Sequence, residues 1–245
     1  MSRTKRQEQI LELLNEYGFL TVEKLSQLVY TSPSSIRRDL TALQNLSLVK
    51  RTHGGASLFD GVGQAVPLVS RMTRNTVEKR IIAKKAAVLL RDGQSVMLDG
   101  SSTAGYLIPY IAKHKDITVF TNNMNTAISS INYGIKTFCI GGFSVDKSAV
   151  LSGPQAYTAV SEINPDILFF SSKSLSKSGI ISDPIQEENY IRSLMLKNAK
   201  TKVFLCDSEK FGDEALYRLD SVDNIDVCVF DKPFHELKTK CKIIV

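Results

Sequence analysis

The chain has 245 residues, 43% of them hydrophobic, which is enough to bury one sizeable core and still form a small additional domain. Its formal net charge of +6 favours anionic partners. No apolar run approaches the roughly 20 residues of a membrane-spanning helix, and no apolar signal core follows the basic start, so we expect a cytoplasmic protein without membrane contact. The four cysteines and three histidines lack metal-ligand spacing, and we expect no disulfide, metal or cofactor.

Half of the positive excess lies near the N-terminus. Residues 1–57 hold eight Lys and Arg against five Asp and Glu, a net charge of +3. This segment is less than a quarter of the chain, and such an asymmetry is typical of a segment that meets nucleic acid.

The same segment predicts three helices in close succession. Residues 4–17 place apolar side chains on one broad face. Thr21 would cap a second helix that runs to Val29, and Ser32 and Pro33 mark the N-cap and first position of a third. Two helices, a tight turn and a further helix form the order of a helix-turn-helix, whose last helix enters the major groove.

The third predicted helix has an apolar face and a polar face. Ile36, Leu40 and Leu43 recur at helical spacing and would face a core. Hydroxyl and guanidinium groups on the other side suit close approach to the DNA backbone and to guanine edges. Taken alone, the pattern is also typical of a solvated surface helix. The polar side carries Ser34, Arg38, Thr41 and Asn45, with Arg37 on its flank.

Residues 48–56 indicate two short strands joined by a turn. Gly54 and Gly55 would supply the positive backbone angles that such a turn requires. A basic hairpin at this place would form a wing, with Lys50 and Arg51 near DNA phosphates.

A linker is expected after the hairpin, because residues 58–75 contain Gly61, Gly63 and Pro67 and show no clear periodicity. We therefore divide the chain into a winged helix-turn-helix domain at 1–57, a linker at 58–75 and a larger domain at 76–245. The larger domain opens with a basic amphipathic helix at 76–90.

Short apolar runs then alternate with helical stretches, which is typical of an α/β domain with a parallel sheet covered by helices. Seven strands are predicted, at residues 95–99, 117–122, 136–142, 167–171, 202–207, 227–231 and 242–245. Helices are predicted at residues 104–113, 124–133, 155–163 and 187–200.

Polar residues follow many of these strands, at the edge where open parallel sheets bind ligands. Residues 99–103 also precede a helix, so their N–H groups and hydroxyls could receive a phosphate. Asp99 would repel that phosphate and better suits a sugar hydroxyl or a role in holding the loop, whereas Lys210 adds a cation. Singly, each residue also fits an ordinary turn or helix cap. The strand-end residues are Asp99, Asn122, Gly141, Gly142, Ser171 and Asp207.

Three blocks of the N-terminal segment resemble the winged-helix signature of the DeoR family of bacterial transcription regulators. They are Leu-Thr-Val-Glu-Lys-Leu-Ser at 20–26, Ser-Ile-Arg-Arg-Asp-Leu at 35–40 and Arg-Thr-His-Gly-Gly-Ala at 51–56. The resemblance implies a repressor more often than an activator. Asp39 would orient an arginine rather than touch DNA. The expected DNA-binding residues are Ser34, Ser35, Arg37, Arg38, Thr41, Lys50 and Arg51.

Blocks of the larger domain, such as Glu-Lys-Arg-Ile-Ile-Ala at 78–83 and Asp-Ser-Glu-Lys at 207–210, are similar to the effector domain of the same family. That domain is related in fold to ribose-5-phosphate isomerase and usually senses a phosphorylated sugar. Ser101 and Ser102 depart from the Gly-Thr of many members, which changes the expected loop geometry without removing the site. The expected effector-binding residues are Asp99, Ser101, Ser102, Thr103, Thr121, Asn122, Gly141, Gly142, Asp207 and Lys210.

The leading hypothesis is a regulator whose affinity for a double-stranded DNA operator is changed by a phosphosugar. A homodimer or homotetramer would set two recognition helices about 34 Å apart. One rival hypothesis is a sugar-phosphate isomerase-like enzyme that uses Asp99, Asp207 and Lys210. Another is a DNA-binding protein whose larger domain only assembles subunits. Because binding already explains the strand-end residues, we expect no enzyme.

Overall fold

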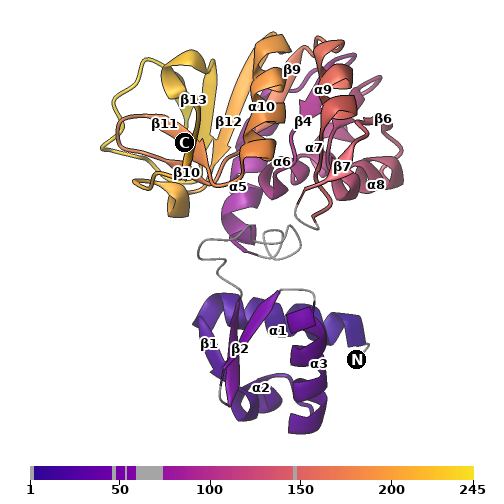
Figure 1. Cartoon of the computed structure of the whole chain (residues 1–245), viewed down its shortest axis with the longest axis vertical. Coiled ribbons are helices and arrows are strands. Elements are labelled where there is room, and N and C mark those ends of the chain that lie inside the picture. Colours follow the sequence, from indigo (N-terminus) through magenta and orange to yellow (C-terminus); the bar gives the residue numbers. More distant parts are fainter. Residues whose placement is uncertain (1–2, 46–47, 53, 59–73, 146–147) are drawn as a thin grey trace. The chain divides into compact units, whose positions relative to one another are not determined.

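The computed structural model describes residues 3–45, 48–52, 54–58, 74–145 and 148–245. The chain divides into two compact units, Met1–Arg74 and Asn75–Val245, and each is described by itself (Figure 1). One hydrophobic cluster forms the core of the N-terminal unit, and two further clusters lie in the C-terminal unit.

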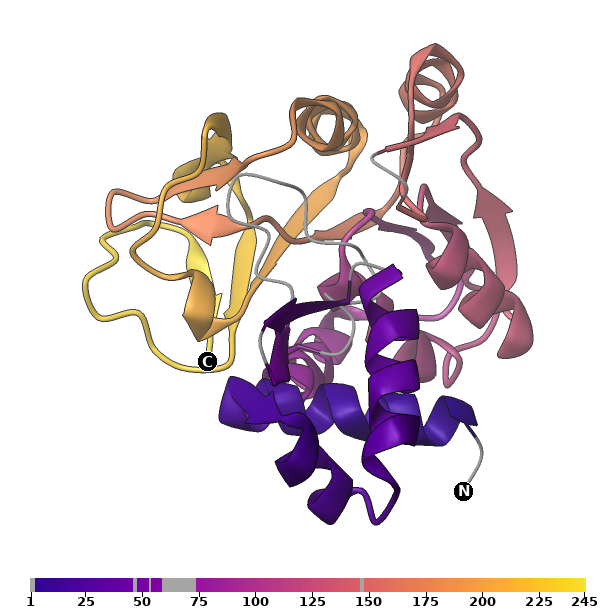
Figure 2. The same ribbon diagram turned by 60° about the horizontal axis from the view of Figure 1, so that its bottom comes forward.

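The described residues of the N-terminal unit form three helices and a three-stranded antiparallel sheet. The helices are α1 (Arg3–Tyr17), α2 (Val22–Leu28) and α3 (Pro33–Asn45). The strands are β1 (Phe19–Thr21), β2 (Val49–Thr52) and β3 (Gly55–Leu58), in the order β1-β3-β2. Figure 2 shows α3 crossing α1, and the core between the helices includes the fully buried Ile10, Leu14, Leu25, Ile36 and Leu40. The predicted helices and hairpin are confirmed, and β1 is a strand that the sequence did not indicate.

The predicted helix caps are present. Thr21 Oγ1 accepts from the backbone N–H of Lys24 over 3.1 Å, and Ser32 Oγ accepts from that of Ser35 over 3.3 Å. Each bond satisfies a donor that the first turn of a helix leaves free.

The two glycines of the hairpin have different roles. Gly54 has a φ of +81°, as predicted, but Gly55 is not among the residues with positive φ, so that part of the prediction is wrong. Gly55 pairs with Thr21 of β1, and a Cβ there would lie 2.4 Å from the carbonyl oxygen of Leu20. The residue is therefore needed for the close approach of β3 to β1 rather than for the turn.

Seven parallel strands form the central sheet of the C-terminal unit, and all seven were predicted. Their order is β15-β14-β12-β9-β4-β5-β6. They are β4 (Ser95–Leu98), β5 (Thr118–Thr121), β6 (Lys136–Cys139), β9 (Ile167–Phe170), β12 (Thr201–Cys206), β14 (Val227–Phe230) and β15 (Lys242–Ile244).

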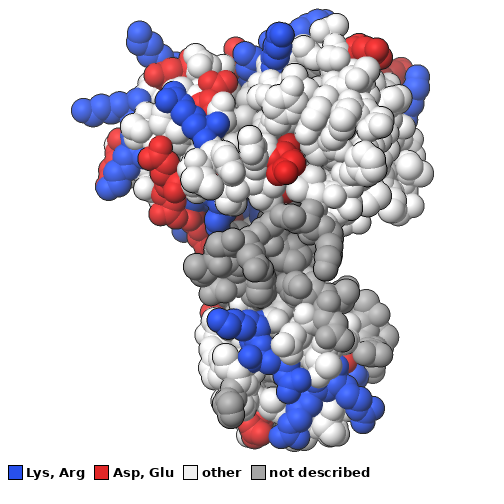
Figure 3. All heavy atoms as spheres, in the orientation of Figure 1, with Lys and Arg blue, Asp and Glu red and all other residues white. Residues whose placement is uncertain are grey.

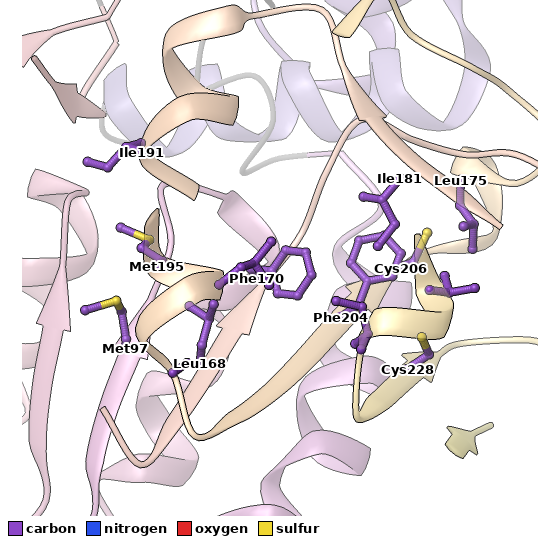
Figure 4. Packing of buried hydrophobic residues seen from close by; sticks show 14 of the residues in the cluster. Met97, Leu168, Phe170, Leu175, Ile181, Ile191, Met195, Phe204, Cys206 and Cys228 are labelled. Carbon is purple, nitrogen blue, oxygen red and sulfur yellow. The ribbon is translucent and has the colours of Figure 1, made fainter. Parts of the chain in front are cut away.

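Helices cover both faces of this sheet. In the central strand β9, Leu168 and Phe170 point into one cluster (Figure 4), to which α9 (Pro154–Ser161) and α10 (Gln186–Asn198) also contribute buried residues. Ile167 and Phe169 point into the cluster on the other face, which includes residues of α5, α6 and α7. A strand buried on both faces reads as a continuous apolar run, which is why β9 was recognisable. The helices of the second face are α5 (Thr76–Ala86), α6 (Ser102–Gly105) and α7 (Ile108–Ile111).

The segment 104–113 contains two short helices, α6 and α7, so the prediction of a single helix there is wrong. Pro109 lacks the N–H that would donate to the carbonyl of Gly105, so a continuous helix cannot form across it. The other helical segments among the described residues are α8 (Met124–Asn132) and the short 3-10 turns η1 (Ala87–Leu89), η2 (Ser208–Lys210) and η3 (Val222–Asn224).

Two smaller sheets were not predicted. One is antiparallel and has the order β10-β11-β13, formed by β10 (Ser174–Leu175), β11 (Ile180–Asp183) and β13 (Tyr217–Ser221). The other is a hairpin of β7 (Phe143–Ser144) and β8 (Leu151–Ser152). The segment 171–179, predicted to be a loop, therefore contains β10.

The order in which the chain adds strands to the sheet reverses between β4 and β9. After β4 it proceeds outward to β5 and β6, and it then returns to β9, on the other side of β4, and proceeds to β12. Such a switch point opens a crevice at the carboxyl ends of the two strands. None of the described helices is long and apolar enough to cross a membrane.

Candidate functional site

Helix α3 presents a polar face above a buried apolar one. Ile36 and Leu40 are fully buried, and Leu43 is nearly so. The side chains of Ser34, Arg37, Arg38 and Thr41 are exposed, and that of Ser35 is partly exposed. The predicted division of this helix between core and solvent is thus observed.

The wing is tied to this helix by one side chain. Arg51 of β2 donates from Nη1 to Thr41 Oγ1 over 2.8 Å, and the Thr41 hydroxyl donates to the Arg37 carbonyl oxygen over 2.8 Å. Lys50 is exposed on the same strand. The face of the N-terminal unit seen in Figure 3 gathers many Lys and Arg side chains. The structure therefore brings the wing and the predicted recognition helix together.

Asp39 anchors α3 to α1 instead of facing solvent. Its carboxylate is 1% exposed and accepts hydrogen bonds from Arg6 Nε over 2.5 Å and from Gln7 Nε2 over 3.2 Å. The arginine that it holds thus belongs to α1. By contrast, Arg37 lies 3.6 Å from the exposed Glu23, a pair that contributes little in water.

In the C-terminal unit, the strand-end residues form a connected hydrogen-bond network. Asp99, after β4, accepts from the N–H and hydroxyl of Ser101, and its other oxygen accepts from the N–H of Ser171, after β9, over 3.4 Å. The Ser171 hydroxyl accepts from Lys210 Nζ over 2.9 Å. Asp99 therefore holds its loop in shape, which was one of its two predicted roles.

A buried arginine that the sequence did not single out joins this network. Arg192 of α10 donates from Nε to Asp99 Oδ2 over 2.9 Å, and its other nitrogens lie 3.5 Å from Asp183 and 3.4 Å from Glu188. Burial alone would lower the pKa of Arg192, but the charges of Asp99, Asp183 and Glu188 outweigh it and raise the pKa. The only sequence signal was Glu188 four residues before Arg192 on one helix.

A narrow cavity, too small in this structure to admit a water molecule, lies beside this arginine at the carboxyl ends of β4 and β5. Oδ1 of Asn122 is buried and has no hydrogen-bond partner among the described residues, whereas its amide donates to the Leu151 carbonyl oxygen. A buried polar atom in this condition is unusual and points to a missing partner. The space is about 160 Å³ with its mouth included, and it is lined by Asp99, Gly100, Asn122, Val150, Glu188, Ile191, Arg192 and Met195.

Asp207 and Lys210 form an ion pair next to this network. Lys210 Nζ lies 3.0 Å from Asp207 Oδ2, and Asn75 Nδ2 donates to Asp207 Oδ1 over 3.0 Å. Burial would raise the pKa of Asp207, but the charge and hydrogen bond of Lys210, together with the charge of the buried Lys79, outweigh it and lower the pKa. Lys210 is thus held by two partners, although its side chain remains 17% exposed.

The other loop residues of the prediction have structural contacts of their own. Ser101 Oγ accepts from Ala104 N–H and so caps α6, while Ser102 is partly exposed. Thr121 Oγ1 accepts from the N–H of Asn123. The hydroxyl of Thr103 is buried and, like Asn122 Oδ1, lacks a hydrogen-bond partner within the described segments.

Gly141 and Gly142 are exposed and do not line the cavity. They lie beyond the end of β6 at Cys139, so the predicted strand at 136–142 is too long. Gly142 has a φ of +130°, and a Cβ there would lie 2.4 Å from the Ser152 carbonyl oxygen. Across the described parts of the chain, no three His, Cys, Asp or Glu side chains are grouped to hold a metal ion.

Comparison with known families accounts for both units. Residues 6–61 match the DeoR-like helix-turn-helix domain, and residues 74–232 match the DeoR C terminal sensor domain. Among solved structures, the chain is similar to ribose 5-phosphate isomerase A from Methanocaldococcus jannaschii, with 17% identity and a TM-score of 0.42 over 56% of this chain and 55% of that one.

Named relatives are similar to this chain over nearly its whole length. The HTH-type transcriptional regulator GolR of Listeria innocua is 31% identical over 95% of this chain and 92% of its own. The glycerol-3-phosphate regulon repressor of Escherichia coli K12 is 25% identical over the same shares. These relatives are regulators rather than enzymes, and this chain belongs to the DeoR family of DNA-binding transcriptional regulators.

Proposed function

We propose that this regulator represses genes of carbohydrate metabolism and is controlled by a phosphorylated sugar in its C-terminal domain. Two findings support the proposal. The matched C-terminal model is a sensor domain, and one relative is named a repressor of the glycerol-3-phosphate regulon. The proposed division is an operator-binding domain at 1–57, a linker at 58–75 and a sensing domain at 76–245. Such a regulator would act in the cytoplasm, beside the chromosome.

For the operator, we assign base reading to the exposed arginines of α3 and backbone contacts to the wing. Arg38 is exposed on the polar face of the helix and is free to direct its guanidinium at a guanine edge. Ser34 and Ser35 lie in the first turn of the helix, where small hydroxyls permit close approach to phosphate. Lys50 and Arg51 would contact phosphates, with Thr41 holding Arg51 in place.

For the effector, one observation carries the assignment: the buried Asn122 Oδ1 lacks a partner in the described structure, and Asn122 lines a narrow cavity at the carboxyl ends of β4 and β5. A sugar hydroxyl is the donor that such an oxygen needs. The carboxylates around Arg192 would oppose a phosphate there. We therefore place the hydroxyl-bearing end of the effector beside Asn122 and its phosphate toward Lys210, with the 101–103 loop between them.

Binding at this place requires the cavity to widen. The space of about 160 Å³ includes the open mouth and is too narrow for a sugar phosphate as it stands. Glu188, Ile191, Arg192 and Met195 all line it from α10, so this helix is the wall whose displacement would admit the ligand. An effector that prefers the widened form would shift the population of the regulator toward it.

Thermal unfolding of the full chain against a panel of phosphorylated sugars, with the parent sugars as controls, tests the effector. A ligand at 100 times its dissociation constant adds about 2.7 kcal/mol, and about 2–4 °C per kcal/mol is expected at this size. We expect one phosphosugar to raise the midpoint and its parent sugar to leave it unchanged. The same compound must also change affinity for operator DNA. Stabilisation without that change would reject control by this ligand.

Twofold recognition of an operator requires more than one copy of α3. We therefore propose a homodimer or homotetramer, in which two recognition helices meet half-sites about 34 Å apart. A strictly monomeric complex on DNA would contradict this assembly.

A further inference from the structure

The turn between α2 and α3 contains a tyrosine in a backbone conformation that tyrosine rarely adopts. Tyr30 has a φ of +51°, in the left-handed region. The other described non-glycine residues with positive φ are Asn75 and Asp116, two residue types whose short polar side chains tolerate this region. For a bulky side chain this φ is an outlier, so glycine or asparagine would suit the turn better than tyrosine does.

Hydrogen bonds around Tyr30 hold the turn in this conformation. The N–H of Thr31 donates to the carbonyl oxygen of Ser26 over 3.1 Å, and the Ser26 hydroxyl donates to the carbonyl oxygen of Thr31. On the other side, Val29 is buried, and its N–H donates to the carbonyl oxygen of Leu25 over 2.9 Å. A strained residue persists where its surroundings determine its conformation, and such residues cluster at functional sites.

Packing within the chain does not explain the tyrosine. Its side chain is 94% exposed, the highest value among the large exposed apolar and aromatic side chains of the described residues. The ring therefore buries almost no area in the folded chain, although buried area is what an aromatic side chain normally contributes to a fold. A residue that adds strain and almost no packing points to a contact outside the chain.

The position of Tyr30 brings that contact to DNA. Ser32, the N-cap of α3, is two residues further on, and Ser34 lies in the first turn of the helix. Because a recognition helix contacts DNA with its N-terminal residues, the turn that precedes it lies at the surface of the duplex. Two residues span at most about 7 Å, so Tyr30 starts within a side-chain length of the phosphates that the start of α3 approaches.

We propose that the Tyr30 hydroxyl donates a hydrogen bond to a phosphate oxygen of the DNA backbone, where α3 enters the major groove. Tyrosine is one of the donors that position a protein on phosphates without reading the sequence. The fixed turn and the stiff ring set the distance of the hydroxyl from α3, so the contact orients this helix on the duplex. A phenolic hydroxyl adds no positive charge, so unlike Lys50 it releases no counterion. The contact strengthens binding to every sequence equally and leaves the salt dependence unchanged.

DNA binding by the full-length Tyr30→Phe and Tyr30→Asn variants tests this contact. Each variant is titrated by fluorescence anisotropy onto two labelled duplexes of unrelated sequence, each of about 30 base pairs, which is long enough for two half-sites one helical turn apart. Titrations are repeated over a range of salt concentrations, and thermal unfolding is measured on the same proteins. Tyr133→Phe is the matched control, because it removes the hydroxyl of a tyrosine in the C-terminal unit that is 52% exposed.

We expect Tyr30→Phe to weaken binding to both duplexes equally, by about 10-fold, the usual effect of losing a hydrogen bond to a charged group. The slope of log affinity against log salt should stay the same. Tyr30→Asn should bind as weakly as Tyr30→Phe and yet unfold at a higher temperature, because asparagine tolerates the left-handed region. Tyr133→Phe should bind like the unaltered chain.

Three results would overturn the phosphate contact. The first is a Tyr30→Phe variant that binds like the unaltered chain. The second is a loss of affinity confined to one of the two duplexes, which would indicate base reading. The third is a Tyr30→Asn variant that both binds weakly and unfolds at a lower temperature, which would make the tyrosine a structural residue of the turn.

Discussion

Arg192 Nε donates a hydrogen bond to Asp99 Oδ2 over 2.9 Å, with side chains only 3% and 1% exposed, and so fastens α10 to the loop after β4. Replacing the arginine would leave Asp99, Asp183 and Glu188 buried without their shared cation. Because breaking a buried pair from one side costs about 3–5 kcal/mol, Arg192→Met should lower the free energy of unfolding by that amount. Urea denaturation of the full chain measures it. Arg192→Lys, which keeps the charge, should cost clearly less, and a loss below about 1 kcal/mol for Met would remove the cluster from the stability of the fold.

Arg38→Ala should weaken operator binding by about 1–3 kcal/mol and reduce discrimination between operator and unrelated DNA, since a base contact is lost. Binding is measured by fluorescence anisotropy on both DNAs. Arg91→Ala, an exposed arginine of the C-terminal unit, is the control. Lys50→Ala should instead weaken binding to operator and unrelated DNA equally, because a phosphate contact is lost. It should also reduce the slope of log affinity against log salt by about one. Unchanged operator affinity would take Arg38 out of the interface.

Lys210→Ala should weaken binding of the phosphosugar about 10- to 100-fold, the usual worth of a charge-assisted hydrogen bond of about 1.5–3 kcal/mol. Affinity for operator DNA without effector should remain. Calorimetric titration with the phosphosugar gives the first quantity. Lys173→Ala serves as the matched control, because Lys173 is exposed and follows the Ser171–Ser172 pair at the end of β9. If both variants bind like the unaltered chain, the phosphate lies elsewhere.

The ion pair between Asp207 and Lys210 should make the free energy of unfolding depend on pH. Its pKa in the folded chain is lowered, chiefly because Lys210 overcomes the effect of burial. The pair therefore stabilises the fold fully above the unfolded value of about 3.9, and the contribution is lost as the pH falls through the folded pKa. The difference in unfolding free energy between the unaltered chain and Asp207→Asn should shrink on acidification below about pH 4. An equal difference at pH 3 and pH 7 would mean that the contact is not electrostatic.

Local patterns sufficed for most of the fold. The strands β9 and β14 are continuous apolar runs, and β12 ends in one. The start of α3 is marked by Ser32 and Pro33, so both kinds of element can be recognised within a few residues. The missed strands are different. β10 has only two residues and pairs with β11, and β11 contains buried serine and aspartate. The third strand, β13, pairs only with β11, which lies more than thirty residues before it, and no local periodicity marks a strand formed by such distant pairing.

The meeting of polar strand-end residues at one edge of the sheet was predicted, but their contacts were not. Polar residues at strand ends indicate an edge of a parallel sheet, and Asp99, Ser171 and Lys210 do meet there. The role of Arg192 was hidden because its main partner, Asp99, is 93 residues away, so on α10 it resembles any surface charge. At Gly142 the positive φ and the close approach to the Ser152 carbonyl oxygen already require glycine, and a sequence does not distinguish such a requirement from contact with a ligand.

The cluster around Arg192 sets an order in which its members can change during evolution. Three carboxylates share a single guanidinium, so loss of any one acid brings the group closer to neutrality, whereas loss of the base leaves three like charges confined together. Single replacement of Asp183 or Glu188 should therefore be tolerated better than replacement of the arginine. Replacement of Arg192 is expected only after the three carboxylates have been replaced. Arg192 is therefore the most constrained residue of the cluster.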